Sequence, residues 1–111
     1  MAYRFRDMTS ESFRKQEEFA YIEKRMSDFL SILQHELKRM PLARLMCMTH
    51  DDVRLSGERQ CIEVPFSKIP LLLEKVQILG NYQMLSHDED TFYWLSETLV
   101  RYLEARNEEL A

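Results

Sequence analysis

The chain contains few of the residues that interrupt regular structure. Its 111 residues include only two glycines, Gly57 and Gly80, and three prolines. A phosphate-binding loop needs several closely spaced glycines, because its backbone amides must come close to the phosphate. Two isolated glycines cannot build such a loop, which excludes nucleotide hydrolysis of the P-loop kind.

Long hydrophobic runs are also absent. A helix that spans a bilayer needs about 20 consecutive, mainly apolar residues, and no stretch of this chain approaches that length. The first residues include Arg4, Arg6 and Asp7 in place of the continuous apolar stretch of a secretion signal. We therefore expect a cytoplasmic protein that does not bind membranes.

Cysteine occurs only twice, as Cys47 and Cys61. Disulfides are rare in the reducing cytoplasm, where a cysteine is more often a small buried hydrophobic residue. We therefore expect two thiols here and no structural disulfide.

The net charge of −4 is unevenly distributed along the chain. Residues 1–50 carry a net charge of +2, whereas residues 51–111 carry a net charge of −6. Nucleic-acid binding draws much of its affinity from basic side chains that neutralise phosphates and release their counterions. The acidic total therefore argues against nucleic acid as the main partner.

The strongest positive signal is a stretch from Ser10 to Met40 that contains no glycine or proline. Apolar residues recur along it every three or four positions, which is the period of an amphipathic helix. They form a ridge that comprises Phe19, Ile22, Met26, Phe29, Leu33, Leu37 and Met40. At about 1.5 Å per residue the helix would measure about 45 Å, whereas a compact domain of this size is about 35 Å across. Part of the helix is predicted to overhang its own domain.

Shorter elements are predicted after Pro41. The helical period continues through residues 42–48, and alternating apolar residues on both sides of Gly57 predict a β-hairpin with strands near 53–55 and 62–64. Two further helices are predicted over residues 67–80 and 86–103. The predicted fold is mainly α with a minor α+β part: one domain over residues 1–111, with a flexible arm at 1–9, a long helix, a short hairpin, and two helices completing a small bundle that dimerises.

The expected function is protein binding. Each fully buried apolar side chain contributes about 1.5 to 3 kcal/mol, so the overhanging ridge favours a second copy of the chain as its cover. Tyr93 and Trp94 are adjacent in the last predicted helix and cannot both face one core, so one of them is predicted to lie at a client surface. The predicted partner-binding residues are Phe19, Ile22, Met26, Phe29, Leu33, Tyr93 and Trp94. The leading hypothesis is a small non-enzymatic homodimeric adaptor, secretion chaperone or regulator-binding protein without a cofactor.

One alternative is a dimeric DNA-binding transcriptional regulator. The hairpin would act as a wing, and Arg14, Lys15, Lys24 and Arg25 would contact phosphates. Acidic residues interrupt this basic set, as they do on an ordinary solvated helix face. The alternative is therefore ranked second.

A third class is a metal-dependent hydrolase that uses His35, His50, Asp51 and His87, which are ligand types of zinc, manganese and iron sites. Metal-binding helices usually place their ligands three or four residues apart, as in H-E-x-x-H, and these residues do not follow that spacing. Cys47 with His50 would offer a nucleophile and a base, but a cysteine in an apolar run is more often buried. We expect neither a bound metal ion nor enzymatic activity.

Overall fold

A computed structural model describes the backbone of residues 2–50 and 61–106, and the side chains from residue 14 onward within these ranges. The chain forms α1 (Ala2–Arg39), β1 (Leu45–Thr49), β2 (Cys61–Pro65), a 3-10 turn η1 (Phe66–Lys68), α2 (Leu72–Asn81), β3 (Leu85–His87), β4 (Phe92–Leu95) and α3 (Glu97–Ala105). No helix in these ranges is long and apolar enough to cross a membrane.

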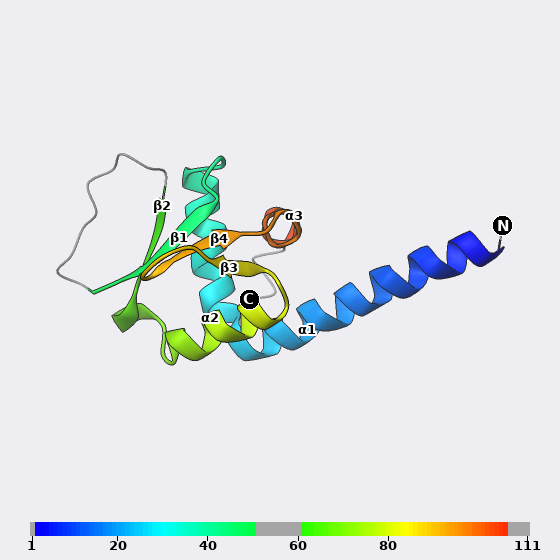
Figure 1. Cartoon of the computed structure of the whole chain (residues 1–111), viewed down its shortest axis with the longest axis horizontal. Helices are drawn as coiled ribbons and strands as arrows, with labels where there is room; N and C mark the ends of the chain where they lie inside the picture. Colours follow the sequence, from blue (N-terminus) through cyan, green and yellow to red (C-terminus); the bar gives the residue numbers. More distant parts are fainter. Residues whose placement is uncertain (1, 51–60, 107–111) are drawn as a thin grey trace.

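The four described strands form one mixed sheet in the order β2-β1-β4-β3 (Figure 1). β1 runs parallel to β2, with Leu45 beside Cys61, and antiparallel to β4, with Leu45 opposite Trp94. β3 pairs antiparallel with β4. Because β1 has a neighbour on each side, it is an interior strand, and all five of its residues are buried. The fold is therefore α+β.

The predicted fold class, a mainly helical bundle with a small hairpin, was wrong. Residues 45–48, expected to extend the first helix, are part of β1, and residues 92–95, expected within the last helix, are β4. An apolar run of four or five residues does not reveal its period, so it fits a buried strand as well as a helix. A strand that is buried on both faces also lacks the alternation that marks a half-exposed strand.

Only part of the predicted hairpin lies within the described residues. Its first strand, at 53–55, lies outside the described residues. Ile62 and Val64 do alternate toward the core as expected, but they belong to β2, which extends the sheet in parallel with β1. The third predicted element, the helix over 67–80, is present as α2 and begins later, at Leu72.

The core lies between one face of the sheet and the three helices. Met46 and Met48 of β1 and Ile62 and Val64 of β2 are buried there together with apolar residues from every helix. The helices contribute Phe29, Leu30 and Leu33 from α1, Leu72, Val76 and Leu79 from α2, and Leu99, Val100 and Leu103 from α3. Because all three helices pack on this one cluster, the end of α3 and part of α2 lie close to the bend of α1.

α1 is bent at Met26, whose backbone angles (φ −148°, ψ 44°) are not helical. The part of α1 after the bend packs on the core, whereas its N-terminal end projects from the body of the molecule (Figure 1). The molecule consequently measures 56 × 26 × 26 Å. The helix begins at Ala2, whereas a flexible arm was predicted from the sequence at residues 1–9.

Candidate functional site at the bend of α1

The five ridge residues predicted to bind a partner are buried within the domain. Ile22, Met26, Phe29 and Leu33 are 0% exposed, and Phe19 is 8% exposed. The ring of Phe19 stacks on that of Tyr102 in α3, with centroids 3.8 Å apart and planes 5° from parallel. The bend wraps the ridge around the chain's own core, so these side chains have intramolecular cover, and their binding of a partner stays a prediction.

Tyr93 and Trp94 lie on β4 rather than on a helix. Successive side chains of a strand point to opposite faces of the sheet, so the two residues diverge. Tyr93 packs against the core and lies 5.0 Å from the His87 ring, between centroids. Trp94 is 45% exposed on the other face. Of this pair, Trp94 is the residue that presents an aromatic surface to solvent.

The histidines lie on separate elements. His35 is exposed on α1, the ring of His50 packs 5.0 Å from that of Phe66, and His87 lies on β3 with its Nε2 atom 2.9 Å from the Asp90 carbonyl oxygen. Asp51 lies outside the described residues. Within residues 14–50 and 61–106, no group of three or more His, Cys, Asp or Glu side chains is arranged to hold a metal ion.

The basic residues of the DNA-binding alternative lie along the N-terminal half of α1. Arg14 and Lys24 are exposed, Lys15 pairs with Glu18 at 3.4 Å, and the guanidinium of Arg25 lies 5.0 Å from the centre of the Tyr21 ring. The described part of the predicted wing is a strand of the main sheet. No separate wing is therefore seen among the described residues.

Cys47 and Cys61 lie on adjacent strands and carry thiols, as expected. Cys47 is buried at the centre of the sheet. Burial, together with the neighbouring Cys61 and Glu63, raises the pKa of the Cys47 thiol to about 12.

We expect Cys47 to resist alkylation while the protein is folded. A rise in its pKa from 9.0 to about 12 lowers the thiolate fraction at neutral pH about a thousandfold. Iodoacetamide labelling followed by peptide mass spectrometry should modify the half-buried Cys61 well before Cys47, and urea should remove the difference. Equal rates in the folded protein would contradict the buried position of β1.

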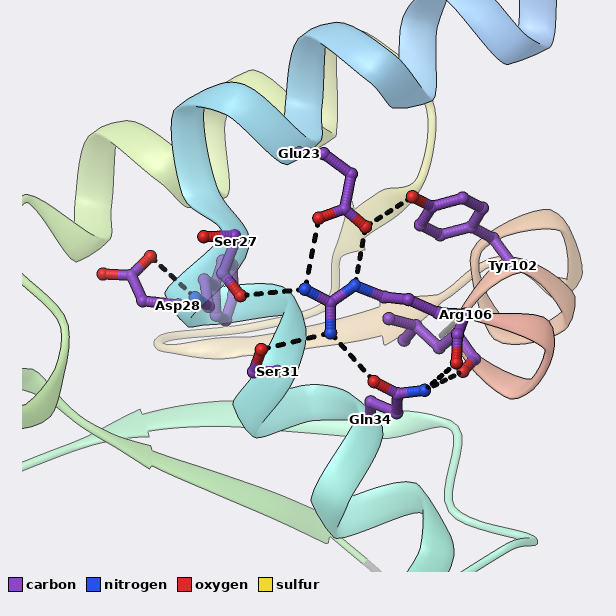
Figure 2. A network of polar contacts seen from close by, with 9 residues as sticks. Glu23, Ser27, Asp28, Ser31, Gln34, Tyr102 and Arg106 are labelled. Atoms are coloured by element: carbon purple, nitrogen blue, oxygen red, sulfur yellow. Dashed lines mark hydrogen bonds and ion pairs between the residues drawn. The ribbon is translucent and has the colours of Figure 1, made fainter. Parts of the chain in front are cut away.

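The most developed polar site of the described chain surrounds Arg106, which directly follows α3. Its side chain is only 4% exposed and reaches back to the bend of α1 (Figure 2). Its Nε and Nη2 atoms donate to the two carboxylate oxygens of Glu23 at 2.6 and 3.1 Å. Nη1 donates to Ser31 Oγ at 3.1 Å and to Gln34 Oε1 at 2.8 Å, and Nη2 donates to the Ser27 carbonyl oxygen at 3.3 Å. A guanidinium has five N–H donors, and here each has an acceptor on α1.

Glu23 balances the charge of Arg106. Burial alone would raise the pKa of Glu23, but hydrogen bonds from Arg106 and Tyr102 and the positive charge of Arg106 outweigh it and lower that pKa. Tyr102 donates to Glu23 Oε1 at 2.5 Å, and burial together with this carboxylate raises the pKa of the Tyr102 hydroxyl. Glu23 therefore stays ionised and Tyr102 stays protonated at neutral pH.

Gln34 connects α1 to the end of α3. It is 3% exposed, and its Nε2 atom donates to the carbonyl oxygens of Leu103 at 2.9 Å and Arg106 at 2.7 Å. The last carbonyls of a helix have no partner within the helix. Gln34 satisfies such a group while its own oxygen accepts from Arg106.

Asp28 anchors the other side of the bend. Its Oδ1 atom accepts from the Phe29 amide at 2.7 Å, where the helix resumes, and its carboxylate lies 3.0 Å from the Nζ atom of Lys75 in α2. The residues just after the bend are thereby tied to α2, while Arg106 ties them to α3.

These polar residues were not identified from the sequence, although a signal exists. Glu23, Ser27, Ser31 and Gln34 are spaced by four, four and three residues, so they form a polar stripe beside the apolar ridge. This stripe contains the hydrogen-bond acceptors, but the donor, Arg106, is 72 to 83 positions away in the chain. The local sequence pattern therefore cannot connect the acceptors with Arg106.

Glu23→Gln should make the fold less stable at neutral pH by about 2 kcal/mol, because it removes a charge-assisted bidentate pair. Since folding lowers the pKa of Glu23, the stabilisation is present above the unfolded-state value of about 4.3 and disappears as pH falls through the lower folded-state pKa. Urea unfolding over an acidic pH series should show wild type and variant converging. Tyr102→Phe, which removes one donor, should show a smaller dependence. Parallel curves for wild type and Glu23→Gln would contradict this assignment.

Comparison with known protein families, curated proteins and solved structures finds no match to this chain. The class that the structure itself defines is a small α+β domain with a bent N-terminal helix. The Arg106 site is a set of intramolecular hydrogen bonds that connects the end of α3 to α1.

Proposed function

We propose that the chain is a small, non-enzymatic, cytoplasmic protein-interaction module that acts as a homodimer, of the adaptor, secretion-chaperone or regulator-binding kind. The projection of α1 carries this proposal. The helix runs beyond a body only 26 Å wide to give a long axis of 56 Å, and the side chains of residues 14–17 are all exposed.

A helix end that projects into water has little intrinsic stability. In water a helix of fewer than about 12 to 15 residues is marginal on its own, and most helices in proteins are stabilised by packing. The N-terminal end of α1 leaves the domain that packs the rest of it (Figure 1). Side-by-side packing of two such helices in a symmetric dimer would supply the missing contacts.

Gln16→Pro tests the proposal, with Gln16→Ala as the matched control. Gln16 is exposed and precedes the first core residue, Phe19. Proline there breaks the projecting helix but fits the first turn of the helix that remains. In analytical ultracentrifugation we expect wild type and Gln16→Ala at twice the 13.4 kDa chain mass, and Gln16→Pro as a folded single chain. Wild type at the single-chain mass at every concentration would refute the homodimer.

Trp94 is the contact that we assign to a protein client, because exposed tryptophan is enriched among energetically important interface residues. Trp94→Ala should leave the mass of the assembly unchanged while weakening capture of a client. Salt-dependent binding of random duplex DNA at physiological ionic strength would instead support the regulator alternative.

A further inference from the structure

The bend in α1 is not at a proline or a glycine, and the local side-chain contact there is the Phe29 amide donating to Asp28 Oδ1 where the helix resumes. Neither glycine nor proline occurs between Ser10 and Met40, yet Met26 leaves the helical conformation. Sharp helix bends arise at proline, at glycine or serine pairs, at bulges, or where a side chain inserts into the hydrogen-bond ladder. Here the Arg106 guanidinium donates to the main-chain carbonyl of Ser27, immediately after Met26.

Arg106 contacts both halves of the bent helix. Glu23 precedes the bend, and Ser27, Ser31 and Gln34 follow it. In a straight helix Glu23 and Gln34 would lie about 16 Å apart along the axis, since each residue adds about 1.5 Å. One guanidinium bonds to both because the bend brings them together (Figure 2).

We propose that Arg106 is a clamp that holds the bend of α1 and so sets the direction in which the N-terminal half of the helix projects. Lys75 on Asp28 and the stacking of Phe19 on Tyr102 fix each half to the domain, but these contacts do not connect one half to the other. The clamp is a conformational control point at the end of α3. Releasing it should widen the range of directions that the N-terminal end of α1 samples, within the limits set by the core packing of Phe19 and Ile22.

All contacts of the clamp lie within one chain, so the clamp can be tested independently of the proposed homodimer. Spin labels are placed at Gln16 and His35, which are exposed on opposite sides of the bend, in a background of Cys47→Ala and Cys61→Ser. Labelled chains are diluted with excess unlabelled chain, so that double electron–electron resonance reports only distances within one molecule. In a straight helix the two backbones would be about 28 Å apart, and the bend makes this distance shorter.

Arg106→Ala should lengthen and broaden the distance distribution, whereas Arg101→Ala, at an exposed position of α3, should not change it. Arg106→Lys should behave like Arg106→Ala, because an ammonium has three donors and cannot serve five acceptors in a plane. An unchanged distribution in folded Arg106→Ala, or full restoration by lysine, would overturn the clamp.

Glu23→Gln keeps the test decisive if Arg106→Ala does not fold. It leaves Arg106 in place and weakens its hold on the projecting half, so a smaller shift in the same direction is expected. The ¹³Cα chemical shift of Met26, whose backbone angles are not helical, should move toward helical values in parallel with the distance. No change in either measurement would refute the proposal, whatever the mass of the assembly.

Discussion

Phe29→Ala should lower the free energy of unfolding by about 3 to 5 kcal/mol. Phe29 is 0% exposed and lies just after the bend, within the cluster shared by the sheet and all three helices. Removing its ring leaves a cavity that the surrounding strands and helices fill only in part, which adds to the lost burial. Urea unfolding followed by circular dichroism measures the change.

The control for this variant is Leu73→Ala, because Leu73 is 56% exposed on α2. That substitution should change stability by less than about 0.5 kcal/mol. The sequence pattern predicted Phe29 to be a partner-binding residue, and a side chain buried only between two molecules would affect the mass of the assembly more than the stability of the chain. A Phe29→Ala protein of unaltered stability and reduced mass would therefore contradict the packing described above.

Gln34→Met should destabilise the fold by about 3 kcal/mol, although the two side chains have similar size and methionine suits a helix well. The substitution removes both donors to the carbonyls of Leu103 and Arg106 and the acceptor of one Arg106 N–H. Each buried polar group left without a partner costs about 1 to 3 kcal/mol. Chemical unfolding and amide hydrogen exchange at the end of α3 provide the measurement.

The comparison for Gln34→Met is Gln77→Met on the exposed face of α2, which should be close to neutral. Gln34→Glu separates the two roles of the amide, because it keeps the acceptor for Arg106 and turns the donors toward the carbonyls into a second acceptor. It should be destabilising too. A neutral Gln34→Met would show that the end of α3 does not depend on these hydrogen bonds.

The sequence predicted what is encoded locally and over many residues. The long amphipathic helix and the helix that became α2 both have several turns of regular apolar spacing, so their period is readable. β1 and β4 have five and four residues, too few to show a period. Their assignment depends on pairing with each other and with β2 and β3, which are distant in the chain.

The site could be predicted only in part for the same reason. The spacing of the ridge residues predicts that they are buried. It does not predict which element buries them, because a second molecule would account for the apolar spacing as well as the chain's own sheet does. The bend at Met26 lies beside the guanidinium of Arg106, which is 80 positions away in the chain. When only the local sequence is considered, the same stretch is predicted to be a straight helix that overhangs its domain.

The separation between Glu23 and Arg106 also orders events during synthesis. Residues bonded across 83 positions cannot meet until Arg106 has left the ribosome. The apolar side of α1 therefore emerges first and stays uncovered while the strands and α3 are still being made. Transiently exposed surface of this kind is where nascent chains aggregate or recruit chaperones, so this small domain is most vulnerable before α3 and Arg106 have been made.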